Sequence, residues 1–150
     1  MSSLQRINKY RQDHDQAGFT LIELLVVVVI IGVLIAIAIP LYLNYQKSSH
    51  DKATASDVRN AVVVAEQCFT DKGVYPDATT TDGTAATIDV SGACGTGAVI
   101  NLSSGTEMTI VNNTTSYKIC AQNASGHGDQ WYNYDSSKGG DVGAAAASVC

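Results

Sequence analysis

The chain has 150 residues, of which 45% are apolar and 15% charged, and its formal net charge is −5 at pH 7. This length fits one domain, and the apolar share is ordinary for a globular protein. The acidic balance and the lack of a basic patch in the sequence argue against general nucleic-acid binding, which needs clustered Lys and Arg to neutralise phosphates. The apolar residues are unevenly distributed, because residues 24–39 contain no charged or strongly polar side chain.

The first 18 residues are polar and are typical of the start of an export signal. They carry Arg6, Lys9 and Arg11 against Asp13 and Asp15, which leaves a net charge of about +1 before the apolar run. An ordinary secretory signal has a short apolar core and an A-x-A-like cleavage site, whereas this run continues to residue 40 without such a site. A helix over residues 19–39 would be roughly 30 Å long, the thickness of the hydrocarbon core of a bilayer.

Glu23 is the exception within this apolar run, since it lies one helical turn after its start. A carboxylate inside a bilayer is unfavourable without a partner, so the sequence predicts a partner for Glu23. The alternative is that Glu23 lies near the membrane interface and reaches water.

Residues 17–27 (AGFTLIELLVV) resemble the class III signal of the type IV pilins and their relatives, the pseudopilins. The resemblance implies that a prepilin peptidase cleaves between Gly18 and Phe19, N-methylates Phe19 and leaves the apolar run in the mature chain. Gly32 and Pro40 stand where family members carry a glycine and a proline, and the family uses them for helix flexibility and a kink. The leader of 18 residues is longer than the common short leader of this family.

Cleavage after Gly18 would create a free amine on Phe19, four residues before Glu23. A positive amine can neutralise a buried carboxylate, and within one helix this pair has nearly the i, i+4 spacing. Between two staggered helices the same pair would set their axial register, which is the assembly role that the resemblance implies for Phe19 and Glu23.

The helix is expected to continue beyond the membrane. Pro40 cannot donate to the carbonyl of Ala36 and disfavours helical geometry at Ile39, so we expect a kink there, the alternative being that the helix ends at Pro40. Helical patterning then resumes, with an apolar stripe of Val58, Val62, Ala65 and Phe69 flanked by Ala61 and Cys68. The charged residues expected on the other faces are Asp51, Lys52, Asp57, Arg59 and Glu66. The sequence thus predicts one kinked helix from about residue 19 to residue 69, closed by Asp71, Gly73 and Pro76, with residues 19–40 as the transmembrane and assembly segment and residues 41–69 as an amphipathic second half.

Residues 70–97 are rich in Thr, Asp, Gly and Ala and are predicted to form a surface loop. Their acidic residues Asp77, Asp82 and Asp89 do not have the spacing of a calcium-binding loop, so no metal site is predicted. Residues 98–150 contain β-prone runs at 108–111, 117–121 and 131–134, with a further candidate strand at 99–102, followed by a Gly/Ala-rich tail. The prediction is an α+β fold, the type IV pilin fold, in which the long helix packs on an antiparallel sheet of three to four strands.

The four cysteines are Cys68, Cys94, Cys120 and Cys150, and no two are spaced as CxxC. Two disulfides in an exported domain are favoured over four free thiols, and three pairings are possible. The resemblance implies the pairs Cys68–Cys94 and Cys120–Cys150, because related pilins with a terminal cysteine close a similar C-terminal loop.

No catalytic residue and no cofactor is predicted. His14, His50 and His127 fall in the leader, on a polar helix face and in a glycine turn, and none has a nucleophile in a recognisable context. The glycosylation tripeptides at Asn101, Asn112, Asn113 and Asn123 are weak signals in a chain rich in Asn, Ser and Thr.

The expected function is that of a structural subunit of a type IV pilus, held in the cell membrane by a single pass and then assembled into a surface filament. The resemblance implies as partners further copies of the chain in a homopolymer, the prepilin peptidase, the inner-membrane assembly platform and, before assembly, membrane lipid. It implies roles in adhesion, motility or DNA uptake. One alternative is a pseudopilin of a type II secretion or competence system, and another is a binding protein whose helix is only an anchor; an enzyme is the least favoured.

Overall fold

The computed structural model describes residues 18–81, 83–147 and 150. Its contacts divide the chain after Pro40 into two units, and the long helix α2 runs through the boundary. The elements are, in order, α2 (Leu21–Lys72), β1 (Ala78–Thr80), β2 (Thr87–Asp89), α3 (Ser91–Cys94), β3 (Val99–Asn101), β4 (Thr106–Asn112), β5 (Tyr117–Asn123), β6 (Trp131–Asp135), the 3-10 turn η1 (Ser136–Lys138) and β7 (Gly143–Ala145).

Helix α2 continues through Pro40 and ends three residues later than the sequence predicts. It closes at Gly73, whose positive φ of 72° suits a glycine and whose N–H donates to the carbonyl of Phe69 at 2.8 Å. Lys72 occupies the last turn, where a cation interacts favourably with the helix dipole. The alternative that Pro40 ends the helix therefore does not hold.

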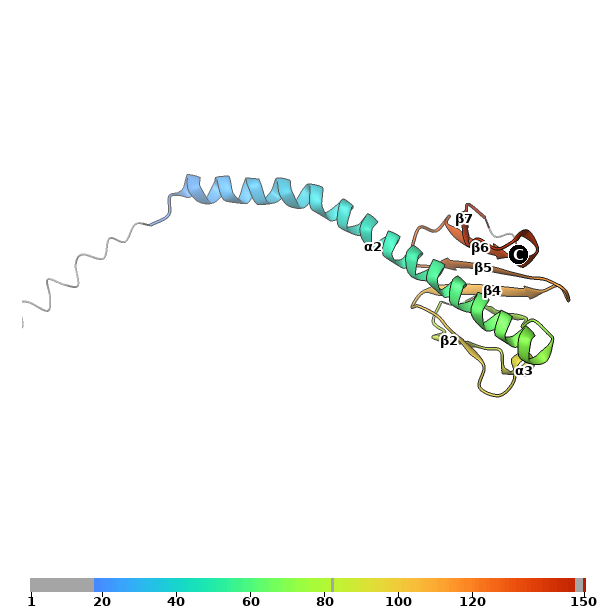
Figure 1. Cartoon of the computed structure of the whole chain (residues 1–150). Helices are drawn as coiled ribbons and strands as arrows, with labels where there is room; N and C mark the ends of the chain where they lie inside the picture. Colours follow the sequence, from blue (N-terminus) through green and yellow to red (C-terminus); the bar gives the residue numbers. More distant parts are fainter. Residues whose placement is uncertain (1–17, 82, 148–149) are drawn as a thin grey trace, which may run out of the picture. The chain divides into compact units, whose positions relative to one another are not determined.

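The sheet of the second unit has five antiparallel strands in the order β1-β4-β5-β6-β7. The three predicted strands are β4, β5 and β6, and the hairpin of β4 and β5 lies at the centre of the sheet (Figure 1). The expected three to four strands were too few, because the three-residue strands β1 and β7 lack any apolar alternation in the sequence. Backbone pairing with β4 and β6 defines them instead.

The segment predicted as a surface loop, residues 70–97, contains β1, β2 and α3. Strand β3, the candidate strand at 99–102, pairs with β2 in a separate two-stranded sheet and does not join the five-stranded one. The segment also contributes to the core, since its Ile88 and Val90 are buried, as is Ile100 of β3 opposite Ile88. Short runs of this kind carry too little periodicity to be distinguished from a loop.

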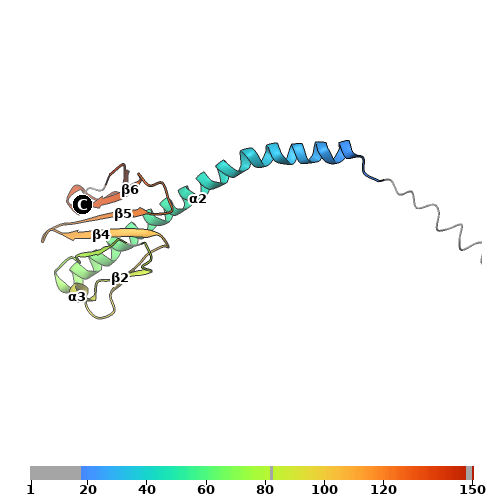
Figure 2. The same ribbon diagram turned by 180° about the vertical axis from the view of Figure 1, so that it is seen from behind.

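The second half of α2 lies along one face of the sheet, and Figure 2 shows the same arrangement from behind. Its buried apolar residues include Val58, Ala61, Ala65 and Cys68, which recur every three or four residues. They meet a group of large side chains from the sheet, Met108, Ile110, Tyr117 and Ile119. The predicted stripe is wrong at its last residue. Cys68 is buried there, whereas the predicted Phe69 is 41% exposed.

Candidate functional site

The start of α2 is fixed by a reciprocal pair of hydrogen bonds between Thr20 and Glu23. The Thr20 N–H and hydroxyl both donate to Glu23 Oε2, at 2.8 and 2.7 Å, and the Glu23 N–H donates to the Thr20 hydroxyl at 3.3 Å. This arrangement is a capping box, in which the side chains of the cap residue and of the third helical residue satisfy free N–H groups of the first turn. Glu23 thus has a local partner that the sequence reasoning missed, although the Thr-x-x-Glu spacing signals it.

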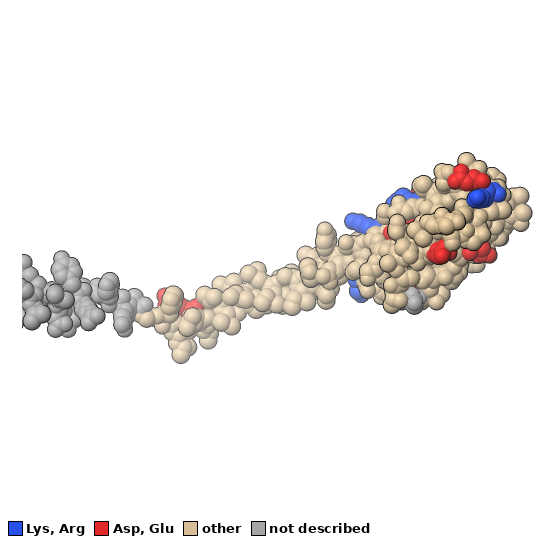
Figure 3. Space-filling model, turned by 90° about the horizontal axis from the view of Figure 1, so that it is seen from below, with Lys and Arg blue, Asp and Glu red and all other residues tan. Residues whose placement is uncertain are grey.

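The apolar segment that follows is exposed on every side. Between Leu21 and Ile39 its large side chains, from Val26 at 48% to Leu21 at 81%, are uncovered by any other part of the described chain. Figure 3 shows this segment without charged groups on the visible face beyond an acidic one near its start. Among the described residues, α2 is the one helix long and apolar enough to cross a membrane. Such a surface is stable only against lipid or against other apolar helices.

The predicted processing and flexibility residues lie along the same segment. Gly18 and Phe19 precede α2, and the Phe19 side chain is 81% exposed. Gly32 lies within α2, and a Cβ built on it would meet no atom within 4 Å. The leader residues 1–17, with His14, fall outside the described residues, as does Asp82.

Two acidic residues expected on the polar faces of α2 are buried in the second unit. Asp57 is 5% exposed and accepts hydrogen bonds from the Ser103 N–H at 2.7 Å, the Ser103 hydroxyl at 3.1 Å and the Thr106 hydroxyl at 2.9 Å. A buried carboxylate is tolerated when several donors satisfy it. These donors come from the loop before β4 and from its first residue, 46 to 49 positions along the chain, so no local pattern could indicate them.

Asp51 is the second buried carboxylate, and its partner is His127. The His127 backbone N–H donates to Asp51 Oδ1 at 3.1 Å, and the His127 ring contacts Asp51 Oδ2 and lies 3.0 Å from Asn44 Oδ1. A Cβ built on Gly126 would lie 2.1 Å from Asp51 Oδ1, so only glycine fits there. His127 therefore fastens the β5–β6 turn to α2, which is a structural role.

A row of aromatic rings joins the end of α2 to the sheet. Tyr117 is fully buried and its hydroxyl donates to Glu66 Oε1 at 2.8 Å, while its ring lies 4.6 Å from that of Tyr75 and 5.5 Å from that of Tyr134. Burial is the main reason that the pKa of Tyr117 is raised, and its hydrogen bonds to Tyr134 and Glu66 add to the effect. The hydroxyl therefore stays protonated and remains a donor at any physiological pH.

Two disulfides connect the four cysteines, Cys68 with Cys94 and Cys120 with Cys150, which are the pairs expected above. The first joins α2 to α3, and the second joins the central strand β5 to the last residue of the chain. Among the described residues no group of three or more His, Cys, Asp or Glu side chains is placed to hold a metal ion. Asp89 serves a local purpose, since its carboxylate accepts the Ser91 N–H at 2.8 Å.

The N-terminal geometry and the fold are consistent with the known proteins to which the chain is similar. Residues 13–39 match the prokaryotic N-terminal methylation motif. The fimbrial protein EcpC of Eikenella corrodens is 38% identical over 92 residues, which cover 57% of this chain and 60% of that protein. The type IV major fimbrial protein FimA of Dichelobacter nodosus is 48% identical over 56 residues, covering 37% of this chain and 36% of FimA.

A third relative is the type IV major pilin protein PilE of Neisseria gonorrhoeae, which is 32% identical over 84 residues, covering 51% of this chain and 46% of PilE. The chain thus spans no more than about three fifths of the length of these curated relatives. No solved structure matches it. The methylation motif and the long helix on an antiparallel sheet make this chain similar to the type IV fimbrial and pilin proteins named above.

Proposed function

We propose that the chain is a structural subunit of a type IV pilus, which is anchored in the membrane, processed by a prepilin peptidase and polymerised through its N-terminal helix. The observation that carries this proposal is the exposed apolar segment of α2, whose one charged residue is Glu23. The relatives named above are fimbrial and major pilin proteins, which supports the same role. Adhesion, motility and DNA uptake are the activities proposed for the assembled filament.

Processing is proposed to occur between Gly18 and Phe19, with N-methylation of the new amine. These residues precede the capping box, so cleavage leaves the amine of Phe19 one residue from Thr20 and four from Glu23. The carboxylate of Glu23 then has two possible partners, its own Thr20 and the amine of an adjacent copy. Pairing between copies would set the axial register of the helices. Gly32 and Pro40 are proposed to let α2 adapt to its neighbours in the filament.

The partners in this scheme are other copies of the chain, the peptidase, the assembly platform of the inner membrane and, before assembly, membrane lipid. The location would change from the cell membrane to the surface pilus. A plain anchor explains Glu23 less well, since such an anchor has no use for a carboxylate in its apolar segment. A pseudopilin of a secretion or competence system shares the motif and is the second candidate.

Mass spectrometry of filaments sheared from the cell surface tests the proposal. We expect this chain as an abundant component, beginning at methylated Phe19, with the two disulfides intact. A chain found in the membrane fraction but in no surface filament would favour the pseudopilin. An assembled chain that begins upstream of Phe19 would contradict the processing scheme.

A further inference from the structure

An apolar groove runs beside the end of α2 in the second unit. It has a volume of about 370 Å³ and is lined by Val63, Val64, Gln67 and Asp71 of α2 and by Cys94 and Val99 across from them. Val63 is 67% exposed and Val99 is 41% exposed, so the groove is uncovered in the single chain. The Cys68–Cys94 disulfide joins its two walls and keeps the groove preformed.

One end of this groove carries a negative charge. Gln67 Nε2 donates to Asp71 Oδ2 at 2.9 Å, which holds the exposed carboxylate of Asp71 about two turns of α2 beyond Val64. The groove therefore presents aliphatic side chains followed by a carboxylate. A complementary binding partner would carry an apolar side chain and a cation, separated by the distance between the aliphatic lining and the carboxylate of the groove.

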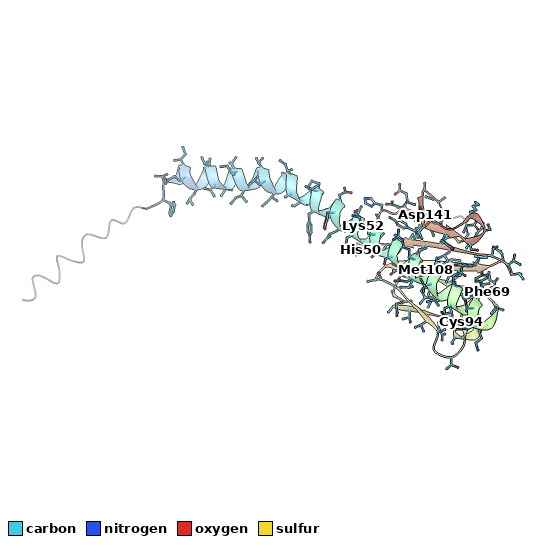
Figure 4. All side chains as sticks on the ribbon, viewed as in Figure 1. His50, Lys52, Phe69, Cys94, Met108 and Asp141 are labelled. Carbon is cyan, nitrogen blue, oxygen red and sulfur yellow. A yellow bond between two sulfur atoms is a disulfide. The ribbon has the colours of Figure 1, made fainter. Side chains whose placement is uncertain are left out.

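An apolar side chain followed by a cation is present on α2 itself, where the helix enters the second unit. Tyr45 is 71% exposed, and the exposed Lys52 follows it by seven residues, which places both on one side of the helix. Ser49 lies between them, so nothing bulky prevents the close approach of another surface. Lys52 makes no ion pair with any described residue. In Figure 4 Lys52 lies at the end of the unit where α2 enters it, and Phe69 and Cys94 lie at the opposite end.

The spacings on the two surfaces are equal. Seven residues separate Tyr45 from Lys52, and seven separate Val64 from Asp71, which corresponds to about 10 Å along a helix in both cases. Both residues of the first pair precede their counterparts by 19 positions, so two parallel copies displaced by about 28 Å along the helix axis would bring the pairs together.

We propose that the groove beside Val64 in one copy of this chain receives Tyr45 of a second copy, with Lys52 of the second copy paired to Asp71 of the first. The inference rests on the proposed function, because insertion of every N-terminal helix in the same direction makes the copies parallel. Tyr45 also lies close in the chain to the exposed side chains of Leu41, Tyr42 and Leu43, so the contact would lie next to the proposed assembly segment in the sequence. Each copy uses its groove for one neighbour and Tyr45 for another, and such a head-to-tail contact produces an open filament.

Charge reversal tests the contact on the full chain in cells that carry the assembly machinery. Asp71→Lys and Lys52→Asp should each reduce the yield of sheared filaments at least about fivefold, since each places like charges together. The double variant restores opposite charges and should recover most of the wild-type yield. Matched controls are Asp77→Lys and Lys138→Asp, at exposed positions outside the contact, which should leave the yield unchanged.

A photoreactive phenylalanine analogue at Tyr45 provides a second, structural readout. Illumination of intact filaments should cross-link Tyr45 to the α2 segment at 60–72 or to residues 94–99 of another copy, as mapped by mass spectrometry. Filaments of the photoreactive variant whose cross-links map elsewhere, or single reversals that assemble as wild type does, would overturn this contact and leave the proposed function standing. A wild-type chain that forms no filament would overturn both.

Discussion

Removal of the Cys120–Cys150 disulfide is expected to destabilise the second unit strongly. The bond closes a loop with a sequence separation of 30 between the central strand β5 and the last residue of the chain. In the chain-entropy treatment a loop of this length stabilises the folded state by about 3.7 kcal/mol at 25 °C. For the roughly 110 residues of this unit, that corresponds to a lowering of Tm by about 15 °C. Among the described residues, other attachments of the C-terminal tail include the pairing of β7 with β6 and the bond from Asn133 Nδ2 to the carbonyl of Ala147.

The measurement is denaturant unfolding of the full chain in detergent, comparing wild type with the double variant Cys120→Ala/Cys150→Ala. Trp131 is the one tryptophan of the chain and lies opposite Ala145 of β7, so its fluorescence reports on the tail that the bond holds. The matched variant Cys68→Ala/Cys94→Ala opens a loop of similar separation, 26, and should lose a similar amount, about 3.5 kcal/mol. A loss below about 1 kcal/mol in the first variant would refute the loop-entropy reasoning.

Three further outcomes are expected. Gly18→Val should leave the leader attached, seen as a heavier chain on gels of the membrane fraction, and a normal N-terminus at Phe19 would contradict the cleavage assignment. Glu23→Gln keeps a capping box, because Gln serves at that position, but removes the charge, so membrane-fraction yield should be normal while filament yield falls sharply; equal filament yields would exclude a role for the charge in assembly. Tyr117→Phe removes the buried hydroxyl that donates to Glu66 and should lower the free energy of unfolding by about 1 kcal/mol, measured by urea titration, with an unchanged value showing that the bond does not stabilise the fold.

The capping box changes the meaning of a Glu23 substitution. Glu23→Val would remove both the charge and a partner of Thr20, so reduced assembly in that variant alone could not be assigned to either. Glu23→Gln and Thr20→Val separate the two contributions, since the first keeps the cap and the second keeps the carboxylate. In this chain Thr20 therefore satisfies the Glu23 carboxylate within one copy, before any second copy is present.

The polar faces of α2 are where the sequence prediction was least accurate. Helical periodicity places Asp51 and Asp57 on the faces of α2 outside the apolar stripe, where solvent exposure is expected. Both residues are nevertheless buried. The donors that make this possible come from Ser103, Thr106 and His127, which are distant in the sequence. Burial of a carboxylate depends on partners that no local pattern encodes, so periodicity could not reveal it.

The sequence by itself determines the features that depend on a continuous run of residues. The apolar segment with its one carboxylate, the length of α2, the methylation motif and the three long strands all follow from local composition and period. Tertiary structure alone decides which short segments become strands, since β1, β2 and β7 are defined by backbone bonds to distant partners. It also decides where the buried carboxylates and the groove beside Val64 lie, because these require residues from two parts of the chain to meet. The physical reason is that hydrophobic periodicity acts along the chain, whereas the satisfaction of polar groups and the shape of a surface arise only after distant segments pack together.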